Sequence, residues 1–327
     1  MNIIFPRRSL VTAAMASPLL VRGRSSQAAP TSPIFGLPVG FPDRLPGDGF
    51  FVRHGYACEN TWYNPGWWHT GEDWYALGGD TAGALVYAVG DGDVVFAGSD
   101  YPGLVVIVRH APDLSSMYGH LDVAASVEPG QPVRRGDRLG TVLDRTDGRA
   151  PSHLHFELRT FLTTAEVNGN APRYGYACGF QCPPGPGYWP IDAPEHPSAM
   201  GWRNSTHLIA HRLFANGAPP ADAEVVVPQG SADSTTRWSE PSDHDAAERL
   251  GDLALDAGDR YRLLAIATGR EASTDTSAEG YRLWYRIELP AGDRAWVQAA
   301  VPSDHDTGSD GRPSSVRFNL LPALAAD

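Results

Sequence analysis

Short apolar runs separated by polar turns dominate the chain from residue 84 onward. Runs of four to eight such residues, bounded by Gly, Pro or Asp, are typical of β-strands. The pattern predicts strands at 84–89, 93–98, 104–110, 115–121, 138–143 and 153–159. Tight turns between consecutive strands favour an antiparallel meander. We therefore predict a mainly β domain at 51–198, after an extended, Pro- and Gly-rich lead-in at 29–50.

A second group of apolar runs follows at 223–227, 260–268, 281–289 and 294–301. Glycine, aspartate and proline turns divide them, which indicates a small β-barrel at 222–303. Its ending, YRLWYRIELPAGDRAWVQAAVP, resembles the last hairpin of bacterial SH3-like domains. Between the two units, 199–221 is interpreted as a linker with one short helix around His207–Phe214, and 304–327 as a polar tail.

The first 28 residues combine a basic start, a modest apolar run and small residues near Ala28. Such a segment is typical of a cleaved export signal, and Arg7-Arg8 favours the twin-arginine type over an ordinary secretory signal. We expect an exported protein that is periplasmic, associated with the cell wall, or secreted. No later run approaches the roughly 20 apolar residues that span a bilayer, so no membrane span is expected.

The net charge and the cysteines add two expectations, one about binding partners and one about disulfides. The formal charge is −12, which argues against nucleic acid as a partner because phosphate binding requires clustered cations. Outside the cytoplasm, Cys58, Cys178 and Cys182 are expected to form one disulfide and leave one thiol, with the pairing open. A zinc site on Cys178 and Cys182 is the weaker alternative. The segment 160–187 holds two of these cysteines without a strand pattern, and is expected to be a surface insertion.

Candidate chemistry lies in three fragments: His69-Thr70-Gly71-Glu72-Asp73, Tyr118-Gly119-His120-Leu121 and His153-Leu154-His155-Phe156-Glu157. In a strand, alternate side chains share a face, so His153 and His155 point away from Leu154, Phe156 and Leu158. Two imidazoles opposite an apolar stripe indicate a polar pocket on the far side of a core.

The residue types in these fragments fit a catalytic zinc site. Such a site takes three protein ligands, from His and carboxylates, and leaves one position open. His69, Asp73 and one member of the His153/His155 pair supply that set. Gly71 argues against a regular helix between His69 and Asp73, so we expect a strand end or a bent loop there.

Together, the fragments resemble the M23 family of zinc metallopeptidases, the lysostaphin and LytM type, over roughly residues 65–195. The family pattern of His-x-Gly-x-Asp, Tyr-x-His-Leu and His-x-His-Phe-Glu occurs here in order. The resemblance implies that one zinc ion per chain is held by His69, Asp73 and His155. It also implies that His120 and His153 are the catalytic histidines, assisting a zinc-activated water in hydrolysing peptide bonds of peptidoglycan.

Other residues near the motifs have less specific signals. Tyr118 is expected to share the strand face of His120 and could orient substrate, although a half-buried strand aromatic is an equal interpretation. Trp68 could line the cleft or simply pack. Glu157 could support the metal site, with a surface carboxylate as the default. His207 and His211 are expected to lie on an ordinary helix.

Two rival functions are compatible with the same residues. One is a non-catalytic M23-like scaffold that binds the wall or activates other hydrolases. The other is a secreted peptidase that acts on proteins. Retention of His69, Asp73 and His155 favours the enzyme. We expect a monomer that binds peptidoglycan peptides.

Overall fold

The computed structural model describes residues 35–161, 187–227, 234–268, 283–300 and 321–323, apart from short gaps at 45, 48, 58, 61–63, 77, 100–102, 123–125, 147, 149, 213–218, 220, 222, 242–246 and 257. The expected export signal, the three cysteines and most of the expected insertion at 160–187 lie outside the described residues. Within the described part, strands far outnumber helices. The prediction of a mainly β, antiparallel protein is confirmed.

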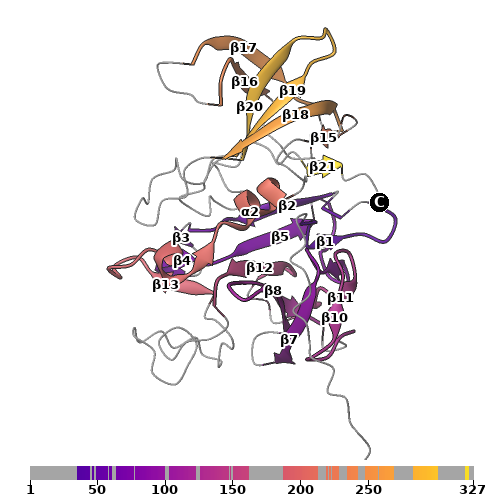
Figure 1. The fold of residues 1–327 in the computed structure, drawn as a ribbon, viewed down its shortest axis with the longest axis vertical. Helices are drawn as coiled ribbons and strands as arrows, with labels where there is room; N and C mark the ends of the chain where they lie inside the picture. The colour runs from indigo at the N-terminus through magenta and orange to yellow at the C-terminus, as the bar shows by residue number, and fades with distance from the viewer. Residues whose placement is uncertain are drawn as a thin grey trace, which may run out of the picture.

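An eight-stranded antiparallel sheet forms the first unit (Figure 1). Its main path runs β10 (Pro132–Val133), β7 (Gly92–Ser99), β8 (Leu104–Ala111), β9 (Leu114–Leu121), β12 (Leu154–Arg159), β5 (Glu72–Ala76) and β2 (Phe50–His54), with β14 (Trp202–Arg203) also paired to β12. β12 lies between β9 and β5, so residues from three separate motifs meet on neighbouring strands.

Two small sheets flank this one. The first comprises β1 (Val39–Gly40), β6 (Leu85–Tyr87) and β11 (Arg138–Thr141), and the second comprises β3 (Glu59–Asn60), β4 (Asn64–His69) and β13 (Tyr188–Pro190). β13 begins just after the expected insertion and pairs with β4, with Tyr188 opposite His69. The end of the insertion is thereby fixed beside the metal-ligand candidate.

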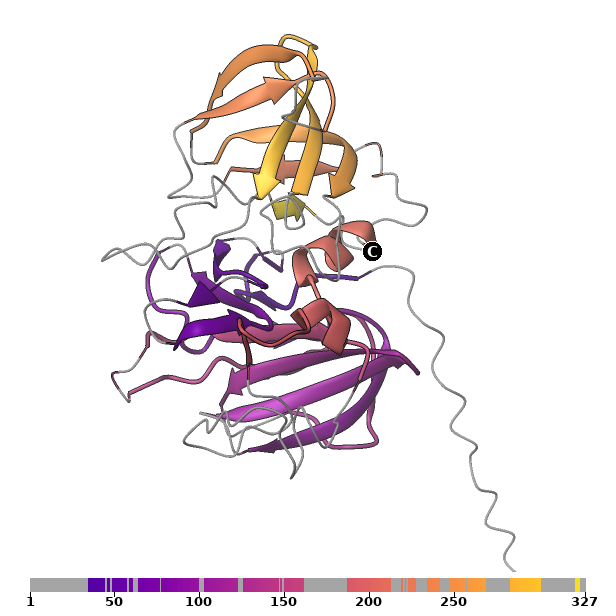
Figure 2. The same cartoon turned by 90° about the vertical axis from the view of Figure 1, so that its left-hand side faces the viewer.

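A seven-stranded sheet forms the second unit, drawn in orange and yellow in Figure 2. Its order is β17 (Arg249–Ala254), β16 (Ser234–Trp238), β20 (Arg294–Ala300), β19 (Leu283–Glu288), β18 (Arg260–Thr268), β15 (Glu224–Val226) and β21 (Leu321–Ala323). β21 pairs with β15 although it falls in the expected tail. The SH3-like identity of this unit and the domain boundaries remain predictions.

Two short helices lie between the units in sequence, α1 (Pro197–Met200) and α2 (Ser205–Arg212). The short helix expected in the linker is therefore present. α2 lies between the two β units in both views (Figure 1, Figure 2), and its Ile209 and Ala210 are buried in an apolar cluster that includes residues of both sheets. No helix in the described residues is long and apolar enough to cross a membrane.

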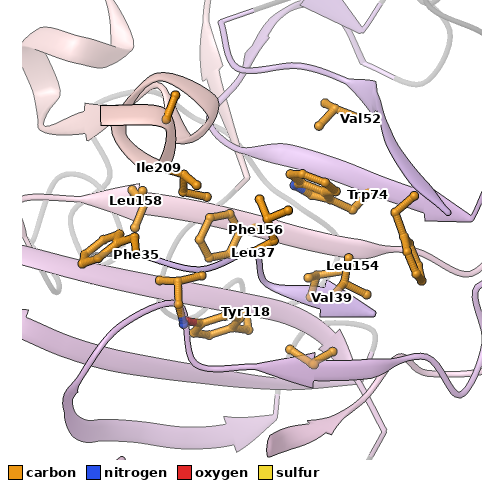
Figure 3. Close-up of a cluster of buried hydrophobic side chains, with 14 of the residues drawn as sticks. Phe35, Leu37, Val39, Val52, Trp74, Tyr118, Leu154, Phe156, Leu158 and Ile209 are labelled. Carbon is orange, nitrogen blue, oxygen red and sulfur yellow. The ribbon is translucent and has the colours of Figure 1, made fainter. Parts of the chain in front are cut away.

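The core of the first unit lies on one face of β12 (Figure 3). Leu154, Phe156 and Leu158 are fully buried there, below Ile209 of α2. The alternation expected for this strand is observed, because His155 and Glu157 lie on the opposite face of β12.

Candidate metal centre

A tight bend between two strands of different sheets carries the first two ligand candidates. His69 ends β4, Thr70 and Gly71 turn the chain, and Asp73 follows in β5. A Cβ at Gly71 would lie 2.6 Å from the Phe156 carbonyl oxygen and 2.9 Å from Cε1 of His155. The absence of a side chain therefore allows the bend at Thr70 and Gly71 to approach β12, as the expected bent loop requires.

β12 supplies the third candidate, because His155 is the direct cross-strand partner of Asp73. His155 Nδ1 lies 3.0 Å from Asp73 Oδ1 and 3.1 Å from His69 Nε2, and His69 Nε2 lies 3.3 Å from Asp73 Oδ1. Zinc bonds of 2.0–2.1 Å place tetrahedral ligand atoms about 3.4 Å apart. The three atoms form a nearly equilateral triangle of that size, and the rings of His69 and His155 meet at 71°.

His54, on β2, is a fourth group at this centre, and its atoms with those of His69 and Asp73 lie within 4.8 Å of one another. Its ring stacks on His69 at 4.3 Å and 6°. A metal lies in the plane of each imidazole that binds it, so two stacked rings cannot both bind one ion in these orientations. His54 Nδ1 instead lies 3.6 Å from Asp73 Oδ2, outside the triangle.

The charges at the centre are strongly coupled. Burial alone would raise the pKa of Asp73, but His69, His153, His155 and His54 outweigh it and hold that pKa well below its usual value. Burial opposes protonation of His155, yet hydrogen bonds to Asp73 and Glu157 raise its pKa to about 9. A buried ionised carboxylate facing several imidazoles is the donor set of a divalent cation site.

The two expected catalytic histidines lie together beside the triangle. The rings of His120 and His153 are 4.6 Å apart, and His153 Nε2 lies 3.7 Å from Asp73 Oδ1. His153 Nδ1 lies 2.8 Å from the Pro151 carbonyl and 3.1 Å from the Tyr75 hydroxyl. Since a carbonyl only accepts, Nδ1 carries the hydrogen and Nε2 carries the lone pair, on the side of the triangle. Burial lowers the pKa of His153.

Tyr118 does not share the face of His120, which corrects that expectation. It is fully buried, its hydroxyl accepts from the Val89 N–H at 2.9 Å, and its ring packs on Phe156 in the core (Figure 3). The reason is local: His120 has a φ of +60°, which interrupts the alternation of the strand. Trp68, in contrast, packs half-buried against the cluster of Tyr56, Trp189 and Trp202.

Several supporting residues had no clear signal in the sequence. Glu157 is completely buried and bonds His155, so the surface default for it is wrong. Trp202 and Thr70 bond the same carboxylate. His207 is buried in α2, and the side chain of His211 lies outside the described residues.

Fold and site together define a mainly β protein with a buried cluster of His69, Asp73 and His155 whose donor atoms are spaced as metal ligands are. A family model described as Peptidase family M23 matches residues 68–170. The match includes all five of His69, Asp73, His120, His153 and His155.

Solved structures of similar proteins include a zinc-containing peptidase from Vibrio cholerae, at 29% identity, with 38% of this chain and 36% of that chain covered and a TM-score of 0.28. Csd3 from Helicobacter pylori is 23% identical, with 39% and 32% covered and a TM-score of 0.28. The antimicrobial peptidase lysostaphin from Staphylococcus simulans is 15% identical, with 83% and 94% covered and a TM-score of 0.33. The chain thus spans about a third of the length of the first two proteins.

Proposed function

We propose that this chain is an exported, zinc-dependent endopeptidase that hydrolyses peptide bonds in the stem peptides or cross-bridges of peptidoglycan. The observation that carries the proposal is the triangle of His69, Asp73 and His155, with His120 and His153 beside it. A structural zinc site has no use for two further imidazoles next to its ligands, whereas hydrolysis needs groups that move protons.

His69, Asp73 and His155 would hold the zinc ion, which when bound supplies Lewis acidity toward a substrate carbonyl and toward water. His153 presents the lone pair of Nε2 toward the reaction site, because its Nδ1 hydrogen is given to Pro151. It is therefore suited to take a proton from the attacking water. The ring of His120 lies edge-to-face with the ring of His153. His120 is therefore placed to stabilise negative charge or to return a proton to the leaving amine.

The choice of substrate rests on the family resemblance and on the expected export signal. The SH3-like unit would hold wall peptides or steady the catalytic unit. A scaffold without catalysis has no need to retain a complete ligand set and the paired histidines, so we favour the enzyme.

Purified sacculi, incubated with the zinc-loaded protein, test the proposal. We expect new amino termini and shortened or uncoupled muropeptides by mass spectrometry, lost on chelation and restored by added zinc. The same preparation is assayed on a panel of folded and unfolded proteins. Cleavage of proteins alone would assign the chain to the general secreted peptidases, and cleavage of neither would favour the scaffold.

A further inference from the structure

Glu157 forms a buried polar hub directly behind His155. Its Oε1 lies 3.0 Å from His155 Nε2 and accepts from the Thr70 hydroxyl at 2.8 Å. Its Oε2 accepts from the Trp202 indole N–H at 3.0 Å, with Arg159 Nη2 at 3.5 Å. Donors converge on both oxygens of a carboxylate that is completely buried, so the group is ionised and only accepts.

This arrangement determines which nitrogen of His155 faces the metal centre. Because Glu157 only accepts, His155 Nε2 keeps its hydrogen, and Nδ1, which faces His69 and Asp73, is the nitrogen that presents a lone pair once His155 is neutral. A carboxylate that holds the outer nitrogen of a ligand histidine fixes its tautomer and its ring orientation. The position of Glu157 therefore determines how well His155 can bind zinc.

Trp202 holds the other oxygen of Glu157, and it comes from outside the family-matched segment 68–170. It lies in β14, opposite Arg159 of β12, and is fully buried. Tyr56 donates to its backbone carbonyl at 3.3 Å, and its ring packs with those of Trp189 and Phe161. The indole is thus held rigidly by a segment that the motifs do not include.

We infer that Trp202 is a positioning residue of the metal centre, which fixes Glu157 through its indole N–H and, through Glu157, the zinc-binding orientation of His155. The inference rests on the proposed zinc site. Without this donor, Oε2 would keep Arg159 Nη2 as a neighbour, at 3.5 Å. The carboxylate would then turn toward the guanidinium and draw Oε1 away from His155.

The test compares Trp202→Phe with Trp189→Phe in the full-length protein, by competition for zinc with a chromophoric chelator. Trp189 is a matched control: it is also buried in the same aromatic cluster, but its indole N–H donates to the Glu195 carbonyl at 2.8 Å. We expect Trp202→Phe to weaken zinc affinity about tenfold, as loss of such supporting contacts does. Trp189→Phe should bind zinc as the unsubstituted protein does.

Equal zinc affinities for the two variants would overturn the inference and leave the proposed function intact. An unsubstituted protein that binds no zinc would instead remove the proposed function itself. If Trp202→Phe does not fold, Trp202 is replaced by benzothienylalanine, which keeps the ring size and lacks the N–H. Weakened zinc binding in that protein supports the inference, and unchanged binding contradicts it.

Discussion

At the scale of single residues, Gly71 sets the distance between the two halves of the metal centre. An added Cβ would collide with the backbone of β12 and with the His155 ring. Gly71→Ala should therefore push the bend between β4 and β5 away from β12, and we expect strongly weakened zinc binding together with a lower unfolding midpoint. Gly66→Ala is the control for substitution of a nearby glycine, since nothing lies within 4 Å of a Cβ there, although its φ of +84° adds strain. A zinc affinity unaffected by Gly71→Ala would contradict the role given to this close approach.

His120 combines catalytic chemistry with a backbone conformation that side chains rarely adopt, because its φ is +60°. His120→Ala and His120→Gly should both retain zinc and lose turnover, by about 10²- to 10⁴-fold. Glycine adopts this conformation without the Cβ penalty, so His120→Gly should be more stable than His120→Ala by about 1 kcal/mol. Zinc content, sacculus digestion and denaturant unfolding measure the three quantities. Normal turnover in either variant would remove His120 from the mechanism.

Protonation of His155 should compete with zinc. Its pKa is raised to about 9 in the metal-free protein, so below that pH the ion must displace a proton, whereas Asp73 is already ionised. Zinc affinity is therefore expected to rise with pH from 7 to about 9. Above that pH His155 is already neutral, so it should cause no further rise. Calorimetry in buffers of different ionisation enthalpy would detect the released proton. Binding that is independent of pH across this window, without proton release, would contradict the assigned charge state.

The sequence predicted the residues that meet at the centre because strand alternation and motif order depend on local spacing. It did not predict His54, a single histidine at the end of β2, because its place beside Asp73 depends on strand pairing. The same holds for Trp202, which is far from the motifs in sequence. Tyr118 was misplaced because no sequence pattern signals the positive φ of His120.

At the scale of elements, the predicted strands coincide with β6 to β9, β11 and β12 because their apolar runs are continuous. β4, with the sequence NPGWWH, was not predicted, since Pro and Gly interrupt its pattern. β14 and α2 lie in the expected linker but are attached to the first sheet, through pairing with β12 and through Glu72. Such attachments depend on distant partners, so local pattern does not reveal them.

The start of α2 is hydrogen-bonded to β5, the strand that carries Asp73. Asn204 Oδ1 accepts from the His207 N–H at 3.0 Å as a helix cap, and buried Glu72 accepts from both the N–H and the hydroxyl of Thr206. Hydrogen bonds to charged groups contribute about 1.5–3 kcal/mol, so Thr206→Val should lower the free energy of unfolding by about 2 kcal/mol.

Denaturant unfolding measures this loss, with Thr236→Val as the control. The Thr236 hydroxyl bonds Asp252 at 3.2 Å in an exposed position of the second unit, where little change is expected. Equal, small effects of the two substitutions would show that the Glu72 contact does not hold α2.

At the scale of the whole molecule, one apolar cluster joins the two β units through Ile209 and Ala210 of α2. We expect the full chain to unfold in a single calorimetric transition. Ile209→Ala should cost about 3 kcal/mol and separate the transition into two, because it leaves a cavity at the junction. Leu250→Ala, at a residue 37% exposed, is the control with little expected effect. Two transitions in the unsubstituted protein would show that the units unfold independently.

The position of α2 and Trp202 also has a consequence for protein engineering. When domains are recombined between proteins, the limits of a family match are the obvious places to cut. Here a chimaera that ended at residue 170 would omit Trp202 and Ile209, two buried residues that pack against the first unit. A fusion partner should therefore be joined after Arg212, where α2 ends.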